Sequence, residues 1–216
     1  MTTVLLVGCG NMGYAMLAGW LKADPDLNAH VVEPADALRD RAAATGATAV
    51  AGPQDLPRDL SPELIFLAVK PQMMAEVVPA YAGFAGGPAT FVSVAAGTTI
   101  PTLAAMLPGP TPIIRCMPNT PAAIGAGMMV CYANDLTAPA IRDLASVLLA
   151  TSGEVDWIDD EGLMDAVTAV SGSGPAYVFH LIECLGAAGA EMGLPPELSA
   201  KMAMQTVMGA GRLAAE

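Results

Sequence analysis

Basic side chains are scarce in this chain, and the few that exist are scattered. There are nine Lys and Arg against 21 Asp and Glu, which gives a formal net charge of −12 at pH 7. Proteins that bind nucleic acid or anionic membranes carry a concentrated positive patch. The composition therefore argues against both kinds of partner and favours a small molecule or another protein.

Charged residues of either sign are also few. They make up 14% of the 216 residues, whereas apolar residues make up 54%. A chain of this length buries roughly 70% of the surface that its extended form exposes. Because that leaves apolar surface that a monomer does not hide, we expect a homodimer or a higher homo-oligomer.

Paired cysteines and metal-ligand clusters are missing as well. Cys9, Cys116, Cys131 and Cys184 form no C-x-x-C pair and have apolar neighbours, which is typical of core thiols in a reducing compartment. The acidic residues 159–161 have no histidine beside them and precede a helical stretch, so helix capping explains them better than a metal. We therefore expect no metal site and no disulfide.

No leader and no clear membrane span is visible either. The first apolar run begins almost at residue 1, which leaves no room for a signal peptide and predicts a cytoplasmic protein. The apolar stretch 174–192 has nearly the length of a membrane span, yet it contains His180, Glu183 and Glu191. We interpret it as a buried helix.

The chain is organised around a glycine-rich turn that follows the apolar run 4–7. Three glycines of this turn have G-x-G-x-x-G spacing: the first makes a tight turn, the second admits a pyrophosphate, and the third lets the next helix pack on the strand. The helix would direct its positive N-terminal end at the phosphates. The residues that this turn offers to a dinucleotide are Gly8, Gly10, Asn11, Met12 and Gly13.

An acidic residue follows the second apolar run, 29–32, twenty positions after Gly13. A carboxylate in that place accepts hydrogen bonds from the adenosine ribose hydroxyls. Because Glu33 would repel a 2′-phosphate, it predicts a preference for NADH. NADPH is the alternative, through a shifted loop at 34–35 or a phosphate contact of Arg39.

Strand-like and helix-like segments alternate up to residue 158, which predicts a doubly wound, mostly parallel sheet. The expected strands are 4–7, 29–32, 47–51, 64–69, 90–94, 113–116, 125–133 and 153–158, with helices at 11–22, 35–45, 72–81 and 139–150. Small, proline and hydroxyl residues follow three strands and suit a flat nicotinamide ring at the carboxyl edge of the sheet. The expected cofactor contacts there are Ala68, Val69, Lys70, Pro71, Ala95, Ala96, Gly97, Pro118, Asn119 and Thr120.

After residue 158 only helical patterns remain, at 163–170, 174–192 and 195–216. We therefore predict a Rossmann-type dinucleotide-binding domain over 1–158 and an all-helical dimerisation and substrate domain over 159–216. The last helix shows no stop signal before Glu216, so we expect the helical domain to be incomplete at its C-terminus.

Several longer motifs resemble the pyrroline-5-carboxylate reductase family, most specifically RCMPNTP at 115–121 and AVSGSGPAY at 169–177, together with LAVKPQ at 67–72 and VAAGTTI at 94–100. The resemblance covers essentially the whole chain. It implies reduction of L-1-pyrroline-5-carboxylate to L-proline by hydride from NAD(P)H, with LAVKPQ and MPNTP at the cofactor and the helical domain interlocked with a second subunit. It also implies a substrate-carboxylate loop beyond Glu216, so this chain alone is expected to bind dinucleotide and to turn over poorly.

The residues themselves fit imine reduction, which needs a hydride on carbon and one proton on nitrogen but no strong base. A turn over Ser171, Gly172, Ser173 and Gly174 would open a helix whose amides receive the substrate carboxylate. Ser173 and Asn119 are expected to position the reactants, and no acid–base side chain is identified; His180 and Glu183 have no assigned role.

Two other functions stay open. A hydroxyacid dehydrogenase has a similar plan but carries a catalytic lysine on the long helix, where this chain has none after Tyr177, Val178 and Phe179. A non-catalytic NAD(P)-binding regulatory protein is the second alternative. An assay of imine reduction separates the three.

Overall fold

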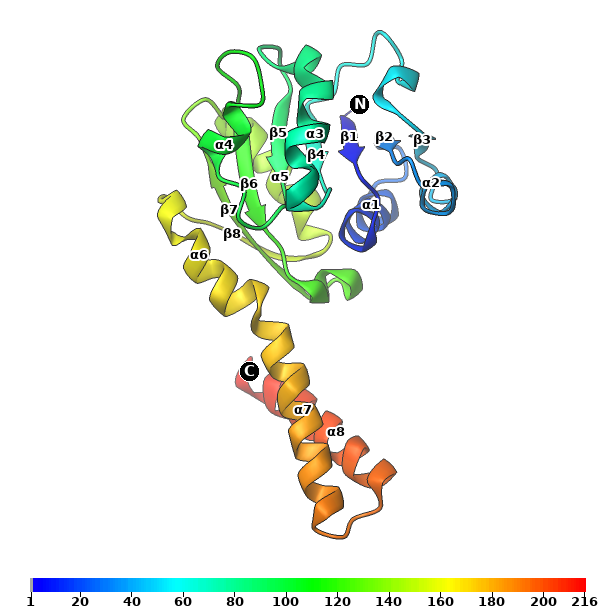
Figure 1. The fold of residues 1–216 in the computed structure, drawn as a ribbon, viewed down its shortest axis with the longest axis vertical. Coiled ribbons are helices and arrows are strands. Elements are labelled where there is room, and N and C mark those ends of the chain that lie inside the picture. The colour runs from blue at the N-terminus through cyan, green and yellow to red at the C-terminus, as the bar shows by residue number, and fades with distance from the viewer. Residues whose placement is uncertain (1) are drawn as a thin grey trace. The chain divides into compact units, whose positions relative to one another are not determined.

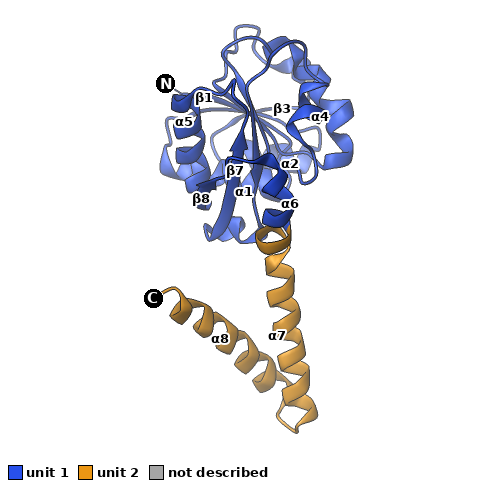
Figure 2. Cartoon of the chain, turned by 90° about the vertical axis from the view of Figure 1, so that its left-hand side faces the viewer, with its two compact units in different colours: residues 1–168 blue, residues 169–216 orange. Residues whose placement is uncertain are grey.

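The computed structural model describes residues 2–216 and divides the chain into two compact units, Met1–Thr168 and Ala169–Glu216 (Figure 2). Each unit is described by itself below. The sequence-based boundary between residues 158 and 159 stays a prediction.

The first unit is built on one eight-stranded sheet in the order β3-β2-β1-β4-β5-β6-β7-β8 (Figure 1). Its strands are β1 (Thr3–Val7), β2 (Asn28–Val32), β3 (Thr48–Val50), β4 (Leu64–Leu67), β5 (Thr90–Ser93), β6 (Ile113–Met117), β7 (Gly127–Ala133) and β8 (Gly153–Trp157). All neighbouring strands are parallel except β6 and β7, which are antiparallel. The predicted doubly wound, mostly parallel sheet is confirmed.

Both faces of the sheet are buried, because side chains alternate along each strand. In β1, Val4 and Leu6 enter one core cluster with Trp20, whereas Leu5 and Val7 enter the other with Tyr81. The first cluster includes residues of α1 (Asn11–Ala23), α2 (Asp36–Ala43) and α5 (Pro139–Ala150), and the second includes residues of α3 (Met74–Val77) and α4 (Ile100–Ala104). The parallel strands therefore end at one edge between two helical layers, where α/β proteins bind their ligands.

One expected helix is wrong. In place of a helix over 72–81, the structure has a 3-10 turn at Pro71–Met73, the four-residue α3, and a 3-10 segment at Val78–Phe84. Pro79 has no backbone N–H and cannot continue α-helical bonding, which explains the break.

The turn predicted at the serine–glycine motif, 171–174, is also wrong. After a 3-10 turn at Glu161–Leu163, α6 (Met164–Val167) is followed by a π-helical segment at Thr168–Gly172 and then by α7 (Gly174–Glu191). Ser173 has right-handed helical dihedrals, φ −88° and ψ −19°. The serine–glycine motif is thus wound into consecutive helical segments, so α7 does not begin as a free helix end.

The second unit is a hairpin of α7 and α8 (Pro196–Ala214) (Figure 1). Ser199 Oγ of α8 donates to the Gly186 carbonyl of α7 at 2.7 Å, and a Cβ on Gly189 would collide with the Ser199 side chain. α7 has no buried residue, so the burial expected for 174–192 is not provided by this chain. None of the helices in the described part of the chain is long and apolar enough to cross a membrane.

Candidate active site

The glycine turn between β1 and α1 meets the steric conditions for a dinucleotide. Gly8 has φ +86°, and a Cβ there would lie 2.8 Å from Val69 Cγ1. A Cβ on Gly13 would collide with the Gly8 carbonyl oxygen, so both positions require glycine. At Gly10, by contrast, a Cβ would have no atom within 4 Å. The turn is closed toward the protein and open at the position where a pyrophosphate would approach.

The N-terminus of α1 is unoccupied by the protein's own groups. Gly10 is its N-cap, no side chain caps it, and its first turn carries no acidic residue. Unsatisfied amides and the positive end of a helix dipole bind phosphate. The turn and α1 together therefore fit the pyrophosphate of a nicotinamide dinucleotide.

Two cavities meet at this turn and share Gly10, Ala68, Val69 and Lys70. The larger, about 470 Å³, also contains Gly8 and Glu33, and the smaller, about 350 Å³, contains Asn11, Met12, Pro71, Ala95, Ala96 and Pro118. Gly13, Gly97 and Asn119 line neither cavity, and Thr120 lines a third. Most of the predicted cofactor residues thus converge on one edge of the sheet.

Part of the larger cavity was missed by the sequence analysis. It is also lined by Leu38, Ala51, Pro53, Met73, Glu76, Val77, Ala80 and Tyr81. Five of these belong to 73–81, the segment that directly follows β4 and the motif LAVKPQ. Their position just after that motif is the sequence feature that could have identified them. Tyr81 is fully enclosed, and burial raises the pKa of its hydroxyl. Apolar walls of this kind suit an adenine ring.

Glu33 braces the glycine turn. It is only 6% exposed, its Oε2 accepts the Cys9 backbone N–H at 2.7 Å, and its Oε1 accepts the Ala35 N–H at 2.9 Å. Burial raises the pKa of the adjacent Cys9 thiol to about 11, so that thiol stays neutral. Both carboxylate oxygens of Glu33 thus hold backbone while the residue still lines the larger cavity.

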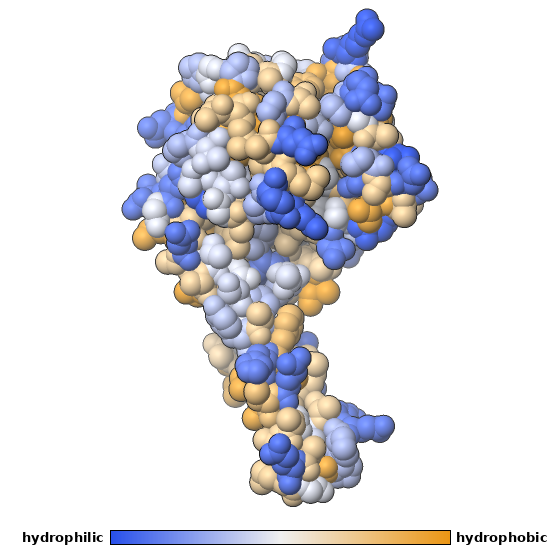
Figure 3. Space-filling model, viewed as in Figure 1, coloured by the Kyte–Doolittle hydropathy of each residue, from blue (hydrophilic) through white to orange (hydrophobic). Residues whose placement is uncertain are grey.

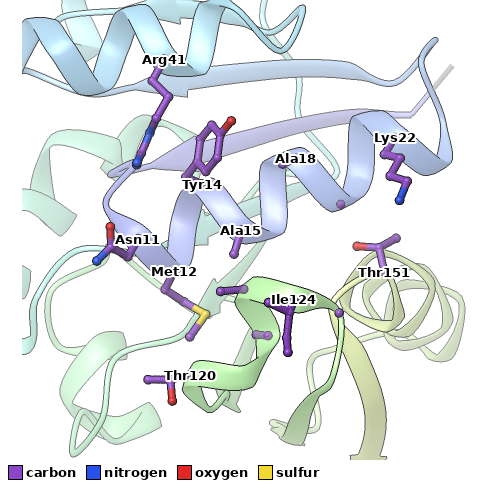
Figure 4. A pocket seen from close by; sticks show the side chains of 14 residues that line it. Asn11, Met12, Tyr14, Ala15, Ala18, Lys22, Arg41, Thr120, Ile124 and Thr151 are labelled. Carbon is purple, nitrogen blue, oxygen red and sulfur yellow. The ribbon is translucent and has the colours of Figure 1, made fainter. Parts of the chain in front are cut away.

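The two arginines of α2 are engaged by other protein groups. Arg39 pairs with Asp36 at 2.6 Å and donates to the Glu33 carbonyl at 3.2 Å. Arg41 donates to the Cys9 carbonyl at 3.1 Å, and its guanidinium carbon lies 4.0 Å from the centre of the Tyr14 ring (Figure 4). Neither side chain is poised, in this conformation, to receive a phosphate in the larger cavity.

Asn119 positions a loop. Its Oδ1 accepts the Met128 backbone N–H at 2.9 Å and so ties the chain after β6 to the beginning of β7. Thr120 begins the 3-10 turn Thr120–Ile124, which lies across a third cavity of about 740 Å³ from α1 (Figure 4). The amide oxygen of Asn119 is therefore committed to the protein, and its effect on a nicotinamide would be exerted through this loop.

A buried ion pair secures the strand that carries this loop. Arg115 of β6 lies 2.8 Å from Glu161 Oε1, which also accepts the Ile100 N–H at 2.8 Å. Arg115 is 6% exposed. The pair joins β6, the beginning of α4 and the 3-10 turn after β8.

In the second unit, α7 carries polar groups two turns after Ser173. His180 Nδ1 lies 3.9 Å from Glu183 Oε2, and His180 Nε2 lies 3.6 Å from Cys184 Sγ. Cys184 is exposed, so its interpretation as a core thiol is wrong, whereas Cys9, Cys116 and Cys131 are buried. Within residues 2–216, no three His, Cys, Asp or Glu side chains are placed to hold a metal ion.

Comparison with known proteins agrees with this geometry. The family model "Pyrroline-5-carboxylate reductase dimerisation" matches residues 161–216, and "NADP oxidoreductase coenzyme F420-dependent" matches residues 3–97. The pyrroline-5-carboxylate reductase of Pseudomonas aeruginosa is 37% identical over 212 residues, which are 98% of this chain and 77% of that protein.

Solved structures give the same result. A pyrroline-5-carboxylate reductase from Coxiella burnetii superposes with a TM-score of 0.91 at 28% identity, covering 99% of this chain and 80% of that one. The Plasmodium falciparum pyrroline carboxylate reductase, solved with NADP bound, superposes at 0.84 with 26% identity over 100% of this chain and 79% of that one. With this glycine turn, these cavities and these relatives, the chain belongs to the pyrroline-5-carboxylate reductase family.

Proposed function

We propose that this chain reduces L-1-pyrroline-5-carboxylate to L-proline with NADH as the preferred hydride donor, in a homodimer. The activity is that of the family to which the chain belongs. The choice of NADH, the roles of individual residues and the dimer are our own inferences. One observation carries the first of these: Glu33 lies in the larger cavity, braced by two backbone amides.

The charges around that cavity support NADH. Its charged lining consists of Glu33, Glu76 and Lys70. A 2′-phosphate there would face two carboxylates, and such like-charge contacts cost several kcal/mol. The ribose hydroxyls of NADH would instead donate to Glu33. The NADP-bound Plasmodium relative makes this a property to test in this chain.

The test compares kcat/KM for NADH and NADPH. We expect the wild-type chain to favour NADH by about tenfold or more. Glu33→Gln should reduce that ratio, because it removes the charge that repels a 2′-phosphate, although it also gives up one of the two backbone hydrogen bonds that Glu33 accepts. Glu76→Gln, an exposed carboxylate of the same cavity, is the matched control and should change the ratio less. A wild-type preference for NADPH of about tenfold or more would reject the proposal.

We assign the nicotinamide end to the loop of Asn119 and Thr120, and the substrate carboxylate to the segment Ser171, Gly172, Ser173 and Gly174. Met117 and Pro118, which directly precede this loop, line the smaller cavity and support the first assignment. Asn119→Ala should raise the cofactor KM and lower kcat, whereas Ser173→Ala should act chiefly on the substrate KM. Unchanged kinetics in both variants would show that the sites are placed wrongly.

When bound, the cofactor supplies a hydride to the imine carbon. The glycine turn and α1 hold its pyrophosphate, and the small side chains of Ala68, Ala95 and Ala96 leave room for a flat ring in the smaller cavity. No side chain of that cavity is needed as a base, since imine reduction consumes a proton.

A further inference from the structure

We propose that Arg41 of α2 is a positioning residue for the dinucleotide. It holds two carbonyls of the glycine turn, so that the backbone amides on the opposite side of the turn face the pyrophosphate. The side chain acts through the backbone and not by contact with the cofactor. The inference rests on the proposed function in one respect, that the chain binds NADH, and it concerns the first unit alone.

Arg41 reaches the point where the glycine turn becomes α1. Its Nη2 donates to the Cys9 carbonyl at 3.1 Å and to the Gly10 carbonyl at 3.4 Å. A guanidinium is permanently charged, and hydrogen bonds from a charged donor are stronger than those between neutral groups. One side chain of α2 therefore fixes two consecutive peptide groups of the turn.

The geometry of the peptide group passes this constraint on to the amides. In a trans peptide the C=O and the following N–H point in opposite directions, and no peptide bond in the described part of the chain is cis. The Cys9 carbonyl shares its peptide group with the Gly10 N–H, and the Gly10 carbonyl shares its own with the Asn11 N–H. Holding both carbonyls toward Arg41 thus directs both amides away from it.

The cavities agree with these directions. Gly10 lines both of the cavities that we assign to the cofactor, and Asn11 lines the smaller one. Arg41 is not among the described residues that line these two cavities, and lines the third cavity instead. The first amides of α1 have no partner within the helix and no side-chain cap, so they are available to an anion on the cofactor side.

The rest of the turn is held from β2. The Gly8 N–H donates to the Val32 carbonyl at 2.9 Å, and the Cys9 N–H donates to Glu33 Oε2 at 2.7 Å. With Arg41 on the carbonyls, the turn is fixed from two elements before a ligand arrives. A site that is already ordered loses less conformational entropy on binding, which raises its affinity.

Tyr14 holds the guanidinium in place. The Arg41 guanidinium carbon lies 4.0 Å from the centre of the Tyr14 ring, a cation–π contact. Figure 4 shows Arg41 reaching from α2 alongside Tyr14 toward the beginning of α1. Because the contact uses the face of the ring, Tyr14→Phe should preserve it, whereas Tyr14→Leu should remove it.

The test measures the Kd of NADH and of NADPH by fluorescence titration of the intact chain. We expect Arg41→Ala to raise both Kd values by about tenfold, since the two dinucleotides share the pyrophosphate and lose the same preorganisation. The NADH to NADPH ratio should stay as in the wild type. In steady-state assays the KM for NADH should rise in parallel, while kcat at saturating NADH stays within about a factor of two, as expected for an interaction that contributes equally in the ground and transition states.

A second arginine provides the matched control. Arg142 of α5 stacks on Trp157 of β8, with its guanidinium carbon 4.5 Å from the ring centre. Arg142→Ala removes the same kind of contact away from the glycine turn and should leave both Kd values unchanged.

The variant Arg41→Lys separates positioning from charge. It keeps a positive charge near the phosphates but lacks the planar group that donates to two carbonyls and stacks on a ring. Its Kd values should therefore resemble those of Arg41→Ala. Tyr14→Leu should weaken binding of both dinucleotides, and Tyr14→Phe should bind them within about a factor of two of the wild type.

Three results would overturn the inference alone: wild-type affinity in Arg41→Ala, wild-type affinity in Arg41→Lys, or a loss confined to NADPH, which would place Arg41 at a 2′-phosphate. If Arg41→Ala does not fold, a folded Tyr14→Leu chain with wild-type Kd values overturns it equally. A wild-type chain that binds neither dinucleotide overturns the proposed function and the inference together. One that binds NADH without reducing the imine overturns the proposed function alone, because the Kd comparison needs no turnover.

Discussion

At the scale of single residues, Gly10 and Gly13 differ in what an added methyl group would meet. A Cβ on Gly13 would collide with the Gly8 carbonyl, whereas one on Gly10 would lie in open space. Gly13→Ala should therefore lower the free energy of unfolding by about 1–3 kcal/mol, as overpacking does. Gly10→Ala should leave stability nearly unchanged but weaken dinucleotide binding, because its methyl group would occupy the pyrophosphate position.

Urea unfolding and NADH titration of both variants measure this difference. Equal losses of stability in the two would contradict the steric account of the turn.

Residue spacing predicted candidate site residues, but it did not show which protein groups their atoms would contact. Glu33 was predicted for ribose hydroxyls, and its oxygens also hold the Cys9 and Ala35 amides. Asn119 was predicted for the nicotinamide end, and its Oδ1 holds Met128. A side chain's rotamer depends on backbone groups that the fold brings near it, and those groups are distant in sequence.

At the scale of elements, the largely buried Arg115–Glu161 pair ties β6 to the 3-10 turn after β8, and the Ile100 N–H joins the same carboxylate. Removing one member of a buried pair leaves an uncompensated charge and costs about 3–5 kcal/mol. Glu161→Ala, which leaves Arg115 6% exposed without its carboxylate, should therefore lower the free energy of unfolding by about that amount. The Arg115→Met and Glu161→Leu double variant should recover most of the loss.

A double-mutant cycle from urea unfolding measures this coupling. Losses that simply add in the double variant would mean that the pair contributes little, as exposed pairs do.

The elements differ in how well the sequence specified them. The central strands β1 and β4 were predicted because both faces of the sheet are covered there, so each reads as a continuous apolar run. The helix expected over 72–81 failed because Pro79 interrupts it. The turn expected at the serine–glycine motif failed because the backbone stays helical there, from the π-helical segment Thr168–Gly172 through Ser173 into α7.

At the scale of the whole molecule, several apolar side chains of the second unit are left partly exposed by the described part of the chain. Val178, Leu181 and Leu185, spaced along one side of α7, are 43%, 50% and 42% exposed. Figure 3 shows hydrophobic surface on the helices of this unit, interrupted by hydrophilic patches. The high apolar content that predicted an oligomer is thus concentrated, in part, where the family dimerisation model matches.

We therefore expect Leu181→Asp to shift the protein from dimer to monomer in sedimentation velocity at micromolar concentration, because it buries a charge in the proposed interface. Val147→Asp, at an exposed apolar position of α5, is the matched control and should leave the dimer intact. If Leu181→Asp also sediments like the wild-type dimer, the interface lies elsewhere.

Three of the four cysteine thiols are buried and one is exposed, so the folded protein should react with alkylating dyes at one cysteine only. Cys9, Cys116 and Cys131 are enclosed, and the pKa values of Cys9 and Cys116 are raised, whereas Cys184 is exposed beside an imidazole. Wherever a second subunit leaves that face of α7 free, a maleimide fluorophore should thus attach at a single position, without removal of any native cysteine. Its emission would report, in real time, whether that helix face stays free or becomes covered by another subunit.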